Sequence, residues 1–257
     1  MALIEFRGVR KAFGPKVVYR HLDLDVQEGE ALTIVGGSGQ GKSVLLKLLI
    51  GLLRVDGGTI RYDGEIVSEL AEEQYGPVRQ QVAMLFQGAA LFDSLSVRDN
   101  ITYGLREHQT LPESEMDARV EEALEYVGLP GTLDMWPADL SVGMQKRVGL
   151  ARAIAMRPRV LLYDEPTTGL DPINVARIDD LILHLQRSLD VTSIVVTHDM
   201  HSAFLVSDRM AMIQDGRVVF SGTPAEFRQT PEPIVRDFID GNAPEDEDTE
   251  TLLRSVG

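Results

Sequence analysis

The sequence has no cysteine among its 257 residues, which excludes disulfide bonds and thiolate metal sites. It also lacks a long apolar segment: the most apolar stretch, residues 44–53, is short, contains Lys47 and cannot span a bilayer. The amino terminus has no basic segment followed by an apolar one, so we expect no signal peptide. These absences predict a chain that is soluble by itself, and the lack of cysteine fits a reducing compartment.

Basic residues are in deficit, because 25 lysines and arginines face 40 aspartates and glutamates, for a net charge of −15. Phosphate backbones repel an acidic surface, so we expect no nucleic-acid partner unless a local basic patch exists. The composition is typical of a globular protein, with 44% hydrophobic and 25% charged residues. The length allows one sizeable α/β domain, or a core with an inserted subdomain.

The hydrophobic pattern is strand-like at first, helical in the middle of the chain and strand-like again after it. Alternation over residues 3–7 and 22–26 predicts half-buried strands, and the apolar run 31–35 predicts a strand buried on both faces. Asp63-Gly64 predicts a hairpin turn, and residues 89–156 form a helical block that interrupts the strand pattern. Further elements are expected as helices over 43–49, 116–127, from about Ser141 and over 175–189, as strands over 160–163 and 193–196, and as a hairpin over 212–219.

Residues 36–43 match the phosphate-binding pattern G-x-x-x-x-G-K-[ST] in full, between an apolar strand and a helix. Glycines let backbone N–H groups face the phosphates, and the helix start adds positive potential. We expect Lys42 to reach the β- and γ-phosphates and Ser43 to ligate Mg²⁺. The alternative, a glycine-rich turn with a solvated lysine, leaves the strand-loop-helix context unexplained. The predicted ATP-binding residues here are Gly36, Gly37, Ser38, Gly39, Gln40, Gly41, Lys42, Ser43 and Val44.

Two carboxylates end the apolar run 160–163. Ligand chemistry in α/β sheets gathers at the carboxyl ends of strands. We expect Asp164 to hold Mg²⁺ through its water shell and Glu165 to orient the attacking water. The alternative, an acidic pair that caps the next turn, is common when such a pair stands alone. Together with the phosphate loop, the pair predicts a P-loop NTPase that binds ATP and Mg²⁺.

Five further patterns make the chain resemble the ATP-binding cassette (ABC) ATPases. Leu140-Ser141-Val142-Gly143-Met144-Gln145 resembles the L-S-G-G-Q signature, and with the other patterns it follows the family's order across the whole chain. Taken singly, a histidine before aspartate is usually a surface residue, and a lone phenylalanine is more often core. The remaining resemblances are Gln87 to the Q-loop, Asp171 in Gly169-Leu170-Asp171 to the D-loop, His198 to the H-loop and Phe13 to the A-loop aromatic.

The resemblance implies an α/β fold of the ABC ATPase type. Such a fold has a P-loop NTPase (RecA-like) core, an antiparallel β subdomain and an inserted α-helical subdomain. We therefore expect a single domain over residues 1–240 and an acidic, flexible tail over 241–257. Within the domain, the core is expected at 1–88 and 157–240 and the helical subdomain at 89–156.

The implied mechanism is a two-fold homodimer that holds ATP between two copies. Ser141 and Gly143, at an expected helix start, form an anion site that in the family meets the γ-phosphate of the other protomer. Val142 departs from the usual glycine, so the backbone there must be β or right-handed helical. By resemblance, the catalytic residues are Glu165, His198, Gln87 and Lys42. The resemblance also implies that the metal ligands are Ser43, Gln87 and Asp164. It further implies that Asp171 couples the two sites and that Phe13 stacks on adenine.

A closer resemblance is to the ATPases of Mla/MCE-type phospholipid-transport systems of bacteria. It lies in Leu85-Phe86-Gln87-Gly88-Ala89-Ala90-Leu91-Phe92, in 105–108 with Leu111-Pro112, and in 231–238. It implies transmembrane permease subunits that dock near Phe92, an MCE-domain lipid-binding protein, a STAS-domain protein, and a peripheral location on the cytoplasmic face of the inner membrane. The alternatives left open are a transporter for another solute, a soluble non-transport ABC protein and a catalytically dead regulator.

Overall fold

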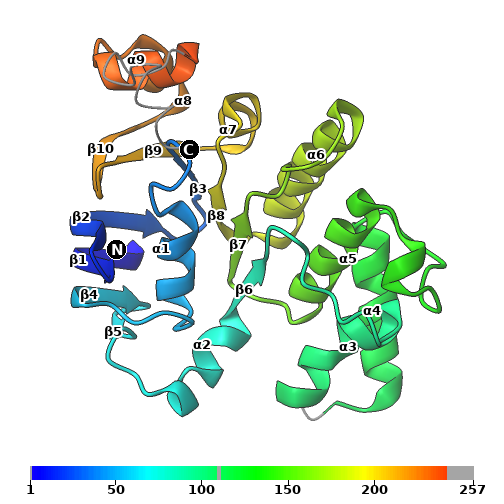
Figure 1. Cartoon of the computed structure of the whole chain (residues 1–257). Helices are drawn as coiled ribbons and strands as arrows, with labels where there is room; N and C mark the ends of the chain where they lie inside the picture. Colours follow the sequence, from blue (N-terminus) through cyan, green and yellow to red (C-terminus); the bar gives the residue numbers. More distant parts are fainter. Residues whose placement is uncertain (1, 109–110, 242–257) are drawn as a thin grey trace, which may run out of the picture.

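The computed structural model describes residues 2–108 and 111–241, whose strands form two sheets (Figure 1). The four-stranded antiparallel sheet has the order β2-β1-β4-β5, and the six-stranded sheet has the order β10-β9-β3-β8-β7-β6. The larger sheet is parallel apart from β10, which pairs antiparallel with β9. The strands are β1 (Ala2–Phe13), β2 (Lys16–Gln27), β3 (Ala31–Val35), β4 (Gly57–Tyr62), β5 (Glu65–Ile66), β6 (Val82–Leu85), β7 (Val160–Asp164), β8 (Thr192–Val196), β9 (Arg209–Gln214) and β10 (Arg217–Gly222).

Helices surround the larger sheet, and three of them, α3 to α5, follow β6 in the chain and stand to one side of it in Figure 1. α5 packs against α3, α4 and β6. The helices are α1 (Lys42–Leu49), α2 (Gly76–Gln81), α3 (Val97–His108), α4 (Glu113–Tyr126), α5 (Val142–Ala155), α6 (Pro172–Leu189), α7 (Met200–Val206), α8 (Pro224–Gln229) and α9 (Pro233–Asp240). Within residues 2–108 and 111–241, no helix is both long and apolar enough to cross a bilayer.

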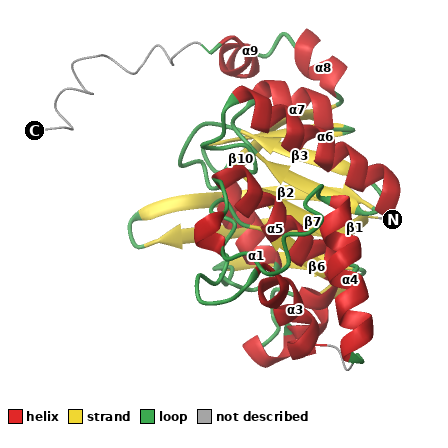
Figure 2. Cartoon of the chain, turned by 90° about the vertical axis from the view of Figure 1, so that its right-hand side faces the viewer, coloured by secondary structure: helices red, strands yellow, loops and turns green. Residues whose placement is uncertain are grey.

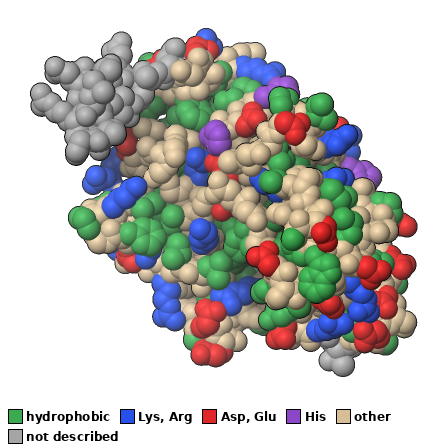
Figure 3. Space-filling model, turned by 45° about the vertical axis from the view of Figure 1, so that its right-hand side comes forward, with side chains coloured by type: hydrophobic (Ala, Val, Ile, Leu, Met, Phe, Trp, Pro, Cys, Tyr) green, Lys and Arg blue, Asp and Glu red, His purple; other side chains and the backbone are tan. Residues whose placement is uncertain are grey.

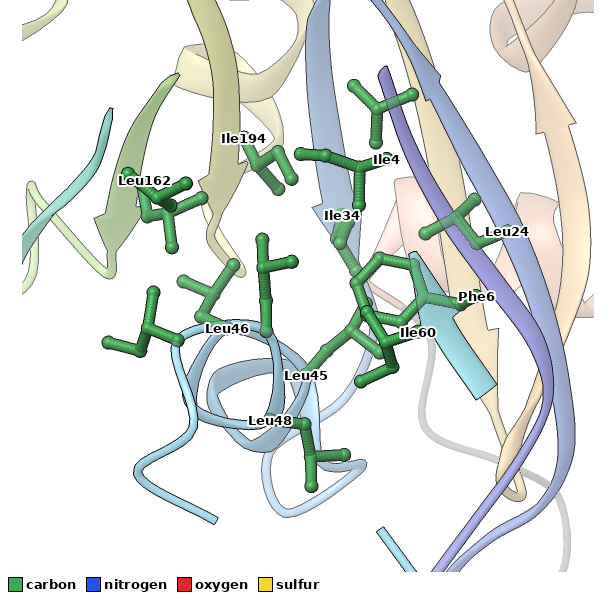
Figure 4. Close-up of a cluster of buried hydrophobic side chains, with 14 of the residues drawn as sticks. Ile4, Phe6, Leu24, Ile34, Leu45, Leu46, Leu48, Ile60, Leu162 and Ile194 are labelled. Atoms are coloured by element: carbon green, nitrogen blue, oxygen red, sulfur yellow. The ribbon is translucent and has the colours of Figure 1, made fainter. Parts of the chain in front are cut away.

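The main core lies where α1 fills the space between the two sheets. Leu45 and Leu46 of α1 are fully buried and lie between Ile34 and Ile194 of the larger sheet and Phe6 of the smaller one (Figure 4). Burying such side chains contributes about 1.5–3 kcal/mol each. The core therefore fixes α1, and with it the loop that precedes α1, at the carboxyl end of β3.

The buried strands match the sequence predictions closely. The expected strand 31–35 coincides with β3, and 160–163 and 193–196 lie within β7 and β8. Asp63 and Gly64 both have positive φ, as the predicted hairpin turn requires. The helix expected from residue 175 begins earlier, at Pro172, because Asp171 caps it. The expected tail lies outside the described residues from 242 onward, and the predicted subdomain boundaries stay predictions.

Candidate active site

The phosphate loop leaves β3 and enters α1 in a conformation that needs glycine. Gly36 has φ +149°, and a Cβ there would lie 2.3 Å from the Ile213 carbonyl oxygen of β9. Gly41 has φ +94°, and a Cβ there would lie 2.4 Å from Val18 Cγ1. L-residues are disfavoured at such φ values, and no side chain fits the space. The loop is thus packed directly against its neighbours, which fixes its backbone N–H groups.

Lys42 is buried beneath the loop that it follows. Its Nζ donates to the carbonyl oxygens of Gly36 at 2.8 Å and Gly37 at 3.1 Å. Glu165 Oε1 lies 3.8 Å from the same nitrogen. Burial lowers the pKa of the Lys42 ammonium, and the charges of Glu165 and Asp164 oppose that shift. Carbonyl dipoles and a carboxylate therefore hold the ammonium at the loop. Phosphate oxygens could replace these groups as acceptors of its hydrogen bonds.

Ser43 and Asp164 bring two hard oxygen donors together. Ser43 Oγ donates to Asp164 Oδ1 at 2.5 Å, which joins the start of α1 to the end of β7. Burial raises the pKa of the Asp164 carboxyl, and the hydrogen bond from Ser43 opposes this shift. A buried carboxylate beside a hydroxyl is a donor set that fits Mg²⁺, since a divalent cation would offset the cost of burying the charge.

Glu165 and His198 meet because their strands are neighbours in the sheet. The Glu165 N–H donates to the Val196 carbonyl oxygen at 2.9 Å, just beyond the β7–β8 ladder. Glu165 Oε2 lies 2.7 Å from His198 Nδ1 and accepts a hydrogen bond from Thr168 Oγ1 at 3.0 Å. Glu165 has φ +49°, a left-handed conformation that is uncommon for glutamate. This turn directs the carboxylate toward Lys42 instead of along the strand.

A cavity of about 720 Å³ collects many of the predicted site residues. Gln87, which follows β6, and Phe13, at the end of β1, both line it with Glu165 and His198. Phe13 is 45% exposed and so lies outside the core. Gln40 turns away, because its Oε1 accepts from the Asp215 N–H at 2.9 Å. Lining residues of the phosphate loop and α1 are Gly37, Ser38, Gly39, Gly41, Lys42, Ser43 and Val44, whereas Gly36 and Asp164 do not line the cavity.

Ser141, Gly143 and Asp171 lie apart from this cavity. Ser141 is the N-cap of α5 and accepts a hydrogen bond from the Met144 N–H at 3.3 Å. Asp171 caps α6 in the same way, through the Ile173 and Asn174 N–H groups. A Cβ on Gly143 would lie 3.3 Å from Asn174 Oδ1, so the two helix starts are adjacent. They form a second group of residues, which one chain does not bring to its own phosphate loop.

Val142 causes no strain at the start of α5. It is the first residue of the helix, so its backbone is right-handed, as the β-branched side chain allows. Its side chain is 55% exposed. The right-handed backbone is one of the two conformations that the sequence predicted for Val142.

Four residues near the site were not predicted from the sequence. Lys16, Val18 and Phe238 line the cavity. Lys146 is buried in α5, where its Nζ donates to the carbonyl oxygens of Glu165, Pro166 and Thr168 at 3.3, 2.8 and 2.8 Å. Burial lowers the pKa of the Lys146 ammonium. Lys146 directly follows the signature-like segment 140–145, and this position was the signal in the sequence that could have indicated its place near the site. Phe238 ends the lipid-transport-like pattern 231–238, but that pattern did not indicate a place at the ATP site.

We expect Lys146→Met to destabilise the chain and to lower ATP turnover. Three carbonyl oxygens would lose their donor, and a loss of about 2–4 kcal/mol in the free energy of unfolding follows from such buried unsatisfied groups. Urea unfolding measures it. Arg187→Met removes an exposed cation of α6 and should change stability by less than about 0.5 kcal/mol. Equal stability of the two variants would show that Lys146 does not hold the loop after Glu165.

Comparison with known proteins agrees with this geometry. The family model of the ABC transporter family matches residues 19–168, which is more than half of the chain. The chain belongs to the ABC transporter family. As an ABC ATPase it binds and hydrolyses ATP.

Two curated relatives of this ABC ATPase match over nearly its whole length. It is 40% identical over 238 residues to the probable ribonucleotide transport ATP-binding protein mkl of Mycobacterium leprae, covering 93% of this chain and 69% of that protein. It is 39% identical over 241 residues to the intermembrane phospholipid transport system ATP-binding protein MlaF of Haemophilus influenzae, covering 94% of this chain and 91% of that protein.

Two solved structures share the fold of this ABC ATPase. CbiO1 from Clostridium perfringens, part of the ABC transporter complex cbiONQ, superposes with a TM-score of 0.81 at 30% identity, over 93% of this chain and 95% of that one. The dimeric cassette MJ0796, bound to ADP and Pi after hydrolysis, superposes with a TM-score of 0.79 at 28% identity, over 86% and 98%. The predicted fold class is therefore confirmed.

Proposed function

We propose that this ABC ATPase is the energising subunit of a membrane transporter that moves phospholipid between bacterial membranes. The observation that carries this proposal is the 39% identity to MlaF, which extends over 91% of that protein's length. The two chains therefore correspond over nearly their whole lengths. The predicted lipid-transport patterns at residues 85–92 and 231–238 point the same way. The subunit would work as a peripheral protein on the cytoplasmic face of the membrane.

The arrangement of Lys42, Glu165 and His198 supports hydrolysis of the terminal phosphate. With ATP bound, the Lys42 ammonium would exchange its contact with Glu165 for the β- and γ-phosphate oxygens. Glu165 would then be free to accept a proton from the attacking water. His198, whose Nδ1 lies 2.7 Å from Glu165 Oε2, would keep the Glu165 carboxylate oriented toward that water. Gln87 lines the same cavity and would sense the γ-phosphate.

Mg²⁺ would be held by Ser43 Oγ and, through water, by Asp164, with Gln87 as a further oxygen donor. When bound, the ion neutralises charge that develops on the β- and γ-phosphate oxygens. The present Ser43–Asp164 hydrogen bond holds these two donors in register at the start of α1. Their separate positions on α1 and β7 make the site depend on the packing of α1 between the sheets.

A homodimer would complete each ATP site. The phosphate loop of one copy would grip the γ-phosphate, and the Ser141 hydroxyl, the Gly143 N–H and the start of α5 of the other copy would contact it from the opposite side. In a single chain, Ser141 and Gly143 do not line the cavity that contains the phosphate loop. This supports a site shared between two copies, because the start of α5 could then contact only the γ-phosphate bound by the other copy. Asp171, adjacent to Gly143 through Asn174, would couple the two sites.

Transmembrane permease subunits would dock at an aromatic pair beside the Gln87 loop. Phe92 and Tyr103 are 43% and 46% exposed, with ring centroids 4.8 Å apart. Asn100 fixes the loop, because its Oδ1 accepts from the Phe92 N–H at 2.8 Å and its Nδ2 donates to the Phe92 carbonyl oxygen at 3.1 Å. A ring with this exposure is not part of the hydrophobic core. By the same resemblance, an MCE-domain and a STAS-domain protein would join the complex.

A transporter of ribonucleotides is the second candidate, because the relative mkl is 40% identical and is named for that cargo.

We still expect no nucleic-acid partner, because the net charge of the chain is acidic. Acidic and basic side chains are interspersed on the face of the molecule shown in Figure 3.

Purification of the chain with its natural membrane partners tests the cargo. We expect the complex to carry phospholipid, detected by mass spectrometry of extracted lipid, and its ATP turnover to depend on the permease. The Lys42→Ala complex controls for lipid that binds without energy input. Bound ribonucleotide other than ATP or ADP, without lipid, would favour the second candidate, and recovery without any permease would contradict both.

A further inference from the structure

Phe238 lines the ATP cavity from the opposite end of the chain to Phe13. The cavity has an apolar part of its lining, formed by Phe13, Val18, Val44 and Phe238, besides the polar phosphate loop. Phe13 ends β1, near the start of the chain, and Phe238 belongs to α9, the last described helix. α8 and α9 lie together at one end of the molecule (Figure 2). The resemblance to the ABC ATPases implies that Phe13 stacks on adenine, and it gives Phe238 no role in ATP binding.

The packing of α9 explains why Phe238 reaches the cavity. Val235, three residues earlier and on the same face of the helix, is fully buried in a cluster with Val35 and Met212. Val35 is the last residue of β3 and directly precedes Gly36 of the phosphate loop. The contact that holds α9 to the core therefore lies next to the loop. Phe238 packs against the same cluster and is only partly buried, so the rest of its ring faces the cavity.

The two rings suit the two faces of a nucleotide base. Phe13 lines the cavity, is 45% exposed and can stack on one face of adenine. The ring of Phe238, in the same lining, offers a contact for the other face or the edge. We propose that Phe238 forms the second aromatic wall of the base site, so that the C-terminal helix α9 is part of the ATP-binding site.

Phe238→Leu tests this inference, which rests on ATP binding at the phosphate loop. Leucine keeps an apolar side chain against the cluster of Val235 but removes the aromatic ring. We expect the full-length variant to bind ADP about 3- to 10-fold more weakly by calorimetry, the range expected for loss of one aromatic contact. Its affinity for inorganic pyrophosphate, which has no base, should be unchanged. Phe238→Trp should retain the affinity for ADP.

Ile234→Ala is the matched control, because Ile234 is an exposed apolar residue of the same helix and does not line the cavity. It should leave both affinities unchanged, and the melting temperature of each variant without nucleotide reports on folding. Unchanged ADP affinity in Phe238→Leu, or equal losses for ADP and pyrophosphate, would overturn the role in base binding. Failure of the wild-type chain to bind either compound would instead refute the proposed function, so the two failures are distinct.

Discussion

Glu165→Gln is expected to abolish ATP turnover and leave ATP binding intact. Glutamine has the same shape, so its side chain can still contact Thr168 and His198, but it cannot accept a proton from water at neutral pH. A fall on the order of 100-fold or more follows from the loss of a positioned base. Phosphate release measures turnover, and calorimetry measures binding. Because the γ-phosphate remains uncleaved, the variant should accumulate as an ATP-bound dimer.

Asp139→Asn is a suitable control for the loss of one carboxylate, since Asp139 is exposed and belongs to the turn before Ser141. Its turnover should equal that of the unmodified chain. Unchanged hydrolysis in Glu165→Gln would remove Glu165 from the role of base, even though His198 lies 2.7 Å from it. Loss of ATP binding in the same variant would mean that Glu165 mainly orders the phosphate loop.

Ser141→Arg is expected to stop turnover while each chain still binds ATP at its own phosphate loop. The arginine would block the start of α5, where we place the contact with the partner's γ-phosphate. Removing one such donor already costs about 100- to 1,000-fold in related anion sites. The loss of the N-cap costs only about 1 kcal/mol, so the exposed position should tolerate the change. Turnover and ATP binding are measured as above.

Thr223→Arg provides the matched control for this substitution. Thr223 is also an N-cap, of α8, and its side chain accepts from the Glu226 N–H at 3.3 Å. The loss of stability should be similar, but turnover should stay near that of the unmodified chain because Thr223 does not line the cavity. Equal losses of turnover in both variants would show that Ser141 acts only as a helix cap.

Short-range patterns predicted the central part of the fold and of the site. A short, mostly apolar run bounded by turn signals is typical of a strand buried on both faces, and this pattern located β3, β7 and β8. The phosphate loop was recognisable from its own residues, because the glycine pattern and Lys42-Ser43 are contiguous in the sequence. The order of the motifs gave Gln87 and His198, which meet the phosphate loop only through the parallel order of the strands.

Contacts between distant segments could not be predicted. Phe238 reaches the cavity because Val235 is buried in the same cluster as Val35, and no local sequence pattern indicates that these distant residues share a cluster. Lys146 is charged, and its burial against three carbonyl oxygens depends on where the turn after Glu165 lies relative to α5. The separate strand β6 and the helix α3 were also missed as elements, since β6 has only four residues and α3 falls in the block whose pattern was only generally helical.

Mixed dimers test most directly whether two chains share each γ-phosphate. In a Glu165→Gln background, chains with Lys42→Ala lack a working phosphate loop and chains with Ser141→Arg lack a working helix start, so neither should dimerise alone with ATP. Mixed together, they can form one intact site per dimer, with the loop of one chain and the helix start of the other. We predict that sedimentation will detect ATP-dependent dimers only in the mixture, each with one nucleotide. A mixture that stays monomeric, or ATP-dependent dimers of the Ser141→Arg chain alone, would contradict the account.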